Sequence, residues 1–209
     1  TSVAGDIAVY YNTDLQMGAS TSKLAFAGSI SNIGGKISYL DESTKDFLPT
    51  NLRLGTAWTA NFDAYNTITL SLDFSKLMVP SPPIYETDEN GDIVFDPNGD
   101  PVILKGKDPN RGVISGMFGS FFDAPDGFSE EMQEFMIAFG AEYWYNNLFA
   151  ARAGYFYENE NKGNRKYFTV GVGFRYQVFG IDFAYLIPTQ QEHPLAETLR
   201  FRLLFNFEN

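Results

Sequence analysis

Few side chains in this sequence could carry out chemistry, and they do not gather in one place. The chain has no cysteine and a single histidine, His193, which stands beside Pro194 in a predicted loop. The lack of cysteine excludes disulfides, thiol catalysis and cysteine-based metal sites. A catalytic histidine needs a hydrogen-bonded partner, and a zinc site needs several ligands. The residues therefore predict no metal site, no cofactor and no catalytic role for His193.

One acidic stretch has the spacing with which a calcium-binding loop begins. It carries Glu86, Asp88, Asn90 and Gly91, and Ile93 falls at the hydrophobic position of such a loop. The first ligand is Glu rather than Asp, however, and Pro97 stands where the closing carboxylate is needed. Asn-Gly pairs are strong signals for tight hairpins. We therefore interpret this stretch as a turn and not as a calcium site.

The other polar groups alternate with apolar residues along predicted strands. The ionisable residues on the polar side of these strands are Arg53, Asp73, Glu142, Arg152, Arg175, Asp182, Arg200 and Arg202. Buried charges are kept where they can pair, and the wall of a selective pore favours one sign of charge. The mixed signs favour a structural network of ion pairs over a path for ions or substrates.

Antiparallel strands must position these charges. Residues 136–178 separate into an aromatic or β-branched side and a polar side three times in succession, and this period of two is typical of strands. A tight turn is predicted at Asn146 and Asn147, a longer polar connection at residues 158–165, and another tight turn at Phe179 and Gly180. Further strands are predicted at residues 6–15, 23–32, 50–63, 67–79, 181–188 and 199–207.

The same alternation fits a soluble β-sandwich and a transmembrane barrel, which differ in the face that they bury. The strands run to about ten residues, the length that a tilted strand needs to cross a bilayer, and short turns alternate with long loops. Aromatic residues gather at strand ends, as at Tyr143, Trp144 and Tyr145. These features predict an all-β chain that forms a transmembrane antiparallel up-and-down β-barrel.

Composition narrows the function further. The formal net charge of -11 argues against a nucleic-acid partner, because phosphates call for a basic surface. The sequence contains no run of 18 apolar residues, so a membrane-spanning helix is not predicted.

Residues 80–133 depart from the strand pattern, and we expect a long extracellular loop. The loop opens with three prolines, contains two Asn-Gly pairs that predict small hairpins, and ends in a short helix capped by Ser129 and ending near Phe135. Its candidate partner-binding residues are Phe118, Phe121, Phe122 and Phe128. These side chains either anchor a partner or fold inward and plug the mouth of a barrel.

The predicted strands number about nine, whereas bacterial single-chain barrels normally have an even number. This count and the abrupt start at Thr1 lead us to expect that residues 1–209 are the C-terminal part of one barrel domain, with further strands preceding them.

Four segments resemble the PorV family, outer-membrane barrels of the type IX secretion system of Bacteroidetes. They are EYWYNNLFAARAGYFYENENKGNRKYFTVGVGF at residues 142–174, SNIGGKISY at 31–39, FLPTNLRLG at 47–55 and PLAETLRFRLLFNF at 194–207. The family is FadL-like, with 14 strands, so the resemblance implies that this chain supplies about nine C-terminal strands of such a barrel.

The resemblance also implies a function. Members of the family act without catalysis as shuttles, which receive cargo proteins with C-terminal signal domains from the SprA-type translocon barrel. They pass this cargo to the PorU-type sortase attachment complex, which anchors it to lipopolysaccharide. The implied location is the bacterial outer membrane, in contact with the lipid bilayer and lipopolysaccharide.

Two other functions remain open from the sequence. A FadL-type transporter of hydrophobic small molecules would use an apolar pocket and a plug. A soluble sandwich or lipocalin-like binder would bury its aromatic face and dissolve without detergent.

Overall fold

The computed structural model describes residues 2–17, 20–38, 45–189 and 198–207. The chain divides into two compact units, each assembled from three separate segments. The first unit comprises Thr1–Ala8, Ser29–Leu52 and Lys76–Phe135, and the second comprises Val9–Gly28, Arg53–Ser75 and Met136–Asn209.

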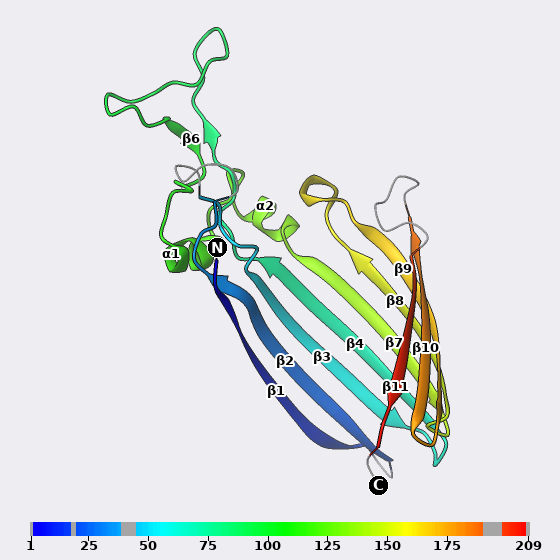
Figure 1. The fold of residues 1–209 in the computed structure, drawn as a ribbon. Coiled ribbons are helices and arrows are strands. Elements are labelled where there is room, and N and C mark those ends of the chain that lie inside the picture. The colour runs from blue at the N-terminus through cyan, green and yellow to red at the C-terminus, as the bar shows by residue number, and fades with distance from the viewer. Residues whose placement is uncertain (1, 18–19, 39–44, 190–197, 208–209) are drawn as a thin grey trace. The chain divides into compact units, whose positions relative to one another are not determined.

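A nine-stranded sheet is the main element of the fold, and its strands follow one another in chain order (Figure 1). The strands are β1 (Ala4–Met17), β2 (Ser20–Gly34), β3 (Asn51–Asn61), β4 (Asn66–Leu77), β7 (Met136–Tyr145), β8 (Phe149–Tyr157), β9 (Lys166–Tyr176), β10 (Phe179–Pro188) and β11 (Leu199–Phe205). Each pair from β4–β7 to β10–β11 is antiparallel. The predicted all-β class and up-and-down strand order are thus confirmed.

The hairpins of the second unit depend on residues that accept a left-handed backbone. Asn146 and Asn147 both have φ of 52° and are the central residues of a turn that the bond from the Leu148 amide to the Tyr145 carbonyl closes at 2.9 Å, so the tight turn predicted there is confirmed. The tight turn predicted at Phe179 and Gly180 is wrong, because both residues already belong to β10. The chain turns at Gln177, which has φ of 51°, so β9 ends two residues earlier than the apolar pattern indicates.

The strands of the second unit carry an apolar and a polar face. Register pairs such as Phe139 with Tyr155 and Val172 with Phe183 lie on the apolar face. This face is exposed over a continuous band, which includes Phe139, Tyr143, Phe149, Phe168, Val170, Val172, Phe183, Tyr185, Phe201 and Leu203. Exposed apolar surface of this extent marks a contact with lipid or with another protein.

Residues 80–133 lie in the first unit and form β5 (Ile84–Tyr85), β6 (Ile103–Lys105), α1 (Val113–Gly119) and α2 (Phe128–Gln133). Isolated bridges join Thr87 to Ile93 and Phe95 to Pro101, so small hairpins lie at the Asn-Gly pairs. Backbone hydrogen bonds also join three segments of the excursion, because the amide of Glu86 donates to Val102, that of Val102 to Val94 and that of Val94 to Glu86.

The helices of this segment differ from the prediction. Ser129 is not the cap of α2, because Gly127, with φ of 72°, lets the chain enter the helix at Phe128. The helix α1 was not predicted, since its glycines weaken the local signal. A Cβ atom on Gly116 would lie 2.5 Å from the ring of Phe47, so close packing explains that glycine. No helix in the described ranges is long and apolar enough to cross a membrane.

The exposure of Val172 makes the orientation of the sheet testable. If the apolar face meets lipid, Val172→Lys near mid-bilayer is expected to destabilise the folded protein by about 2–4 kcal/mol. Thr169→Lys places the same charge on the polar face of the same strand, and we expect a much smaller loss of stability. Folding titrations in lipid vesicles, followed by tryptophan fluorescence, measure both variants. Equal destabilisation would contradict the assignment of the two faces.

Candidate functional site

A buried lysine anchors the segment that carries the candidate phenylalanines. Lys76, near the end of β4, is 0% exposed, and its ammonium lies 3.3 Å from Glu131 of α2. The same ammonium pairs with Glu134, directly after α2. Lys76 follows the apolar residues at the even-numbered positions of β4. Because its side chain is buried, the ammonium has no contact with water and is stabilised by these two carboxylates. The pairing therefore ties α2 to the end of a strand.

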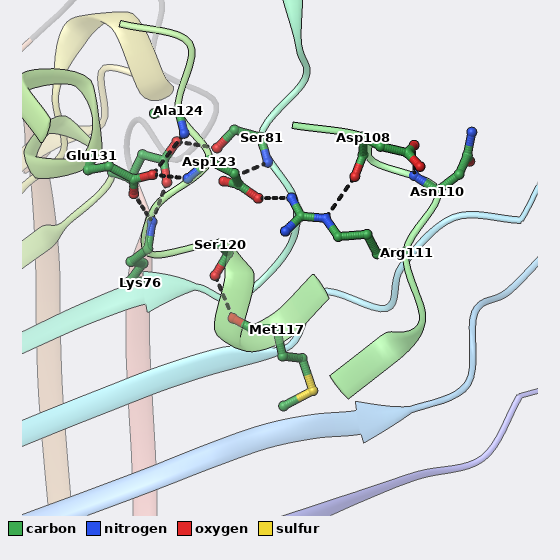
Figure 2. A network of polar contacts seen from close by, with 11 residues as sticks. Lys76, Ser81, Asp108, Asn110, Arg111, Met117, Ser120, Asp123, Ala124 and Glu131 are labelled. Atoms are coloured by element: carbon green, nitrogen blue, oxygen red, sulfur yellow. Dashed lines mark hydrogen bonds and ion pairs between the residues drawn. The ribbon is translucent and has the colours of Figure 1, made fainter. Parts of the chain in front are cut away.

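Glu131 also organises the loop before α2 (Figure 2). Its Oε1 atom accepts the backbone amides of Asp123 at 2.6 Å and Ala124 at 2.8 Å. The hydroxyl of Ser81 donates to Glu134 at 2.7 Å, which connects the start of the excursion to its end. The buried amides and carboxylates thus form hydrogen bonds with one another, and a buried polar network is stable only when its donors and acceptors are paired in this way.

A second buried pair continues this network. Arg111 donates to Asp123 at 2.5 Å and, through Nε, to the carbonyl of Asp108 at 2.7 Å. The Asp123 side chain is fully buried. A Cβ atom on Gly119 would lie 2.1 Å from the guanidinium of Arg111, so the glycine leaves room for this contact. We call Lys76, Ser81, Arg111, Asp123, Glu131 and Glu134 the excursion anchor.

The four candidate phenylalanines have different environments. Phe121 lies against the anchor, with its ring centroid 5.5 Å from the Lys76 ammonium. Phe118, Phe122 and Phe128 are 59%, 76% and 77% exposed. The exposed Ile114 and Met132 belong to the same two helices, and the sequence analysis did not single them out. Three of the four rings are thus exposed, while Phe121 is half-buried beside Lys76.

The sequence analysis did not predict the excursion anchor, although one feature of the sequence indicates it. Lys76 falls on the apolar side of β4, where an unpaired charge is costly, so a distant acidic partner could have been expected. Nothing local indicates which of the chain's many acidic residues supplies it.

Removing the Lys76 charge is expected to loosen the excursion. Lys76→Met leaves Glu131 and Glu134 without their cation, and breaking a buried pair in this way costs about 3–5 kcal/mol. Hydrogen exchange of residues 80–135 should accelerate accordingly. Lys105→Met is the matched control, because Lys105 pairs with Asp126 at 3.1 Å while both side chains are exposed. Similar exchange in the two variants would show that Lys76 is not the anchor.

The polar face of the sheet in the second unit brings four of the eight predicted charged residues together. Arg152 donates to Glu142 at 2.5 Å and to Asp182 at 2.8 Å, and Arg175 donates to Asp182 at 2.8 Å. Trp144 lies 5.4 Å from both guanidinium groups. Trp144 therefore packs against arginines on the polar face, a contact that its place in an aromatic run did not indicate.

Glycines make room for this network. A Cβ atom on Gly173 would lie 2.6 Å from Asp182, and one on Gly180 would lie 2.8 Å from the Arg175 side chain. Gly173 and Gly180 on the polar face therefore leave space for charged side chains.

The other four predicted charges form no ion pair with this network. Asp73 lies against Gly55 of the neighbouring strand, and Arg53, Arg200 and Arg202 are exposed. Arg202 is the register partner of Asp182. None of these four residues forms an ion pair with any residue in the described ranges.

Asp182 joins both arginines, so its loss should cost more than the loss of Glu142. Asp182→Asn is expected to lower the free energy of unfolding by about 1–3 kcal/mol, the range for hydrogen bonds to charged groups. Glu142→Gln should cost less, because Arg152 keeps its bond to Asp182. Urea unfolding in a fixed detergent compares the two. A larger loss for Glu142→Gln would show that Asp182 is not the centre of the network.

The acidic turn binds its own backbone. Asp88 accepts the amides of Asn90 at 2.8 Å and Asp92 at 3.0 Å, and these bonds hold the pKa of Asp88 below its usual value. Within the described part of the chain, no three histidine, aspartate or glutamate side chains are grouped to hold a metal ion. His193 lies outside the described residues.

Comparison with known proteins bears on the first part of the chain. The family model described as type IX secretion system protein PorV matches residues 1–84. No curated protein matches the chain. The matched range covers β1 to β4 and includes two of the four segments on which the resemblance rests, residues 31–39 and 47–55. The match therefore supports the resemblance of this chain to PorV of the type IX secretion system, over its first 84 residues.

Proposed function

We propose that this chain belongs to a non-enzymatic outer-membrane shuttle of type IX secretion. It binds the C-terminal signal domains of cargo proteins that the SprA-type translocon barrel delivers, and it passes them to the PorU-type sortase attachment complex. The match to the PorV family supports the secretion system, and the exposed aromatic surface of the excursion supports a binding role.

The observation that carries the proposal is the exposure of Phe118, Phe122 and Phe128. Large exposed aromatic side chains are costly without a partner, and aromatic residues dominate the energetics of protein interfaces. The excursion anchor fixes the backbone that bears these rings, through Lys76 and Glu131. A preformed surface binds with less loss of conformational entropy than a loop that must first be ordered.

The proposed location is the outer membrane, with the long loops outside the cell and close to lipopolysaccharide. The apolar band on the sheet supports contact with lipid. On the opposite face, charged residues form ion pairs with one another, as expected for a barrel interior filled by side chains.

The hydrogen bonds of the buried carboxylates support a function in binding and not in catalysis. Glu131, Glu134 and Asp123 accept hydrogen bonds from lysine, arginine, hydroxyl and amide donors within the excursion anchor. A general base must be able to accept a proton from a substrate, whereas these carboxylates are engaged by groups of the protein itself.

A transporter of hydrophobic molecules is the competing function. The hollow of about 490 Å³ on the polar face is lined in part by Asp73, Glu142 and Arg152. These charges are unfavourable neighbours for an apolar ligand. These three charges therefore weigh against an apolar ligand in this hollow, although aromatic and alanine side chains also line it.

Replacement of the exposed rings tests the proposal. In the full-length protein, Phe118→Ala, Phe122→Ala and Phe128→Ala together are expected to reduce recovery of translocon and signal-domain cargo from native membranes by about tenfold or more, since interface anchors each contribute over about 1 kcal/mol. Quantitative mass spectrometry after a pull-down in mild detergent measures this loss.

Phe95→Ala is the matched control, because Phe95 is 60% exposed on the hairpins of the same excursion. Its recovery of partners should equal that of the native protein. Unchanged recovery by the triple variant would contradict the proposed surface. Recovery of the native barrel with fatty acids and without secreted proteins would favour the transporter.

A further inference from the structure

The hollow on the polar face of the sheet contains a carboxylate that no ion pair neutralises. Its volume of about 490 Å³ lies within the usual range for small-molecule sites. Residues of β4, β7, β8 and β9 line it, and all of these residues belong to the second unit. The hollow is therefore described completely within one compact unit.

The strand register explains why the centre of the hollow is deep. Ser71, Gly140, Gly154 and Thr169 are register partners across the four strands, so this row of the sheet carries only glycines and short hydroxyl side chains. A Cβ atom on Gly140 would lie 2.6 Å from the Ser71 hydroxyl, and one on Gly154 would lie 2.7 Å from the Thr169 hydroxyl. The two hydroxyl groups therefore lie close over the glycines and give the hollow a polar floor.

The charges that line the hollow do not balance. Glu142 and Arg152, which are register partners on one side of the floor, form an ion pair. Arg165, near the other side, is paired with Glu158 at 2.7 Å. Asp73 also lines the hollow and is half-buried, yet no cation in the described ranges pairs with it. The hollow therefore has one carboxylate in excess.

The row of the sheet that contains Asp73 continues into an aromatic pair. Its register partner on β7 is Ala138, and Phe156 and Tyr167 follow on β8 and β9. The two rings stack, with their centroids 4.9 Å apart. Because the side chain of Ala138 is short, it leaves space between the carboxylate and the rings.

We propose that this hollow binds a small organic cation, that is, an ammonium or guanidinium group carried on a short carbon chain. The Asp73 carboxylate accepts hydrogen bonds from the cationic group, and such charge-assisted bonds are the strong ones. The hydroxyls of Ser71 and Thr169 accept further bonds. The rings of Phe156 and Tyr167 contact the carbon chain. The site is independent of the proposed shuttle function, because it uses no residue of the excursion.

Isothermal titration calorimetry tests the site on the full-length protein in nanodiscs of a zwitterionic lipid, with empty nanodiscs as the blank. The probes n-butylammonium and n-butylguanidinium represent free cations, and the N-acetyl amides of lysine and arginine carry the same groups on a peptide unit. Butanol lacks the charge, the ammonium ion lacks the carbon chain, and butyrate reverses the charge. We expect saturable binding of at least one organic cation, weaker binding of butanol and of the ammonium ion, and no binding of butyrate. Preference among the four cations identifies the cationic group and its source.

Two variants locate the binding. Asp73→Asn should weaken binding of the preferred cation by about tenfold, because it removes the charge that strengthens the hydrogen bonds. Ala138→Lys places an ammonium group beside Asp73 inside the hollow and should abolish binding of the probe. Glu160→Gln is the matched control, because Glu160 is an exposed acidic residue of the same unit that does not line the hollow. Its binding should be unchanged.

Three results would overturn the proposal. They are the absence of saturable binding for all four organic cations, equal affinity for butanol and the preferred cation, and a loss of affinity in Glu160→Gln equal to that in Asp73→Asn. Thermal unfolding without probe checks the folding of each variant. The probe series on the native protein decides the proposal independently of the variants.

Discussion

The burial of the Lys76 ammonium is the constraint on which the first unit depends. A lysine without water is stable only when carboxylates reach it, and Glu131 and Glu134 do so from 55 and 58 residues further along the chain. Their arrival fixes α2, and Glu131 then binds the amides of the preceding loop. One desolvated charge thus determines the path of a long excursion that has little regular structure of its own.

In the second unit, too, charged side chains are stabilised by pairing, here on the polar face of the sheet. Asp182 lies between Arg152 and Arg175, and the three side chains come from three neighbouring strands. Here the strand register brings opposite charges together, and glycines at positions such as Gly173 leave space for them. In both units the charged side chains of these networks pair with one another, and the exposed aromatic side chains lie outside the networks.

The match to the PorV family and the candidate binding surface fall on different parts of the chain. The match ends at residue 84, whereas Phe118, Phe122 and Phe128 lie beyond it. The family match therefore bears on the secretion system, and the argument for a docking surface rests on exposure and on the excursion anchor.

The sequence by itself determined the all-β class, the strand order and the two faces of the sheet, because a period of two is a local property of the backbone. It also determined the turn at Asn146 and Asn147, where asparagine tolerates positive φ. Only the tertiary structure decided that Phe121 lies half-buried beside the Lys76 ammonium while Phe122, its neighbour, remains exposed. Such contacts depend on which distant segments meet, and local periodicity carries no information about that path.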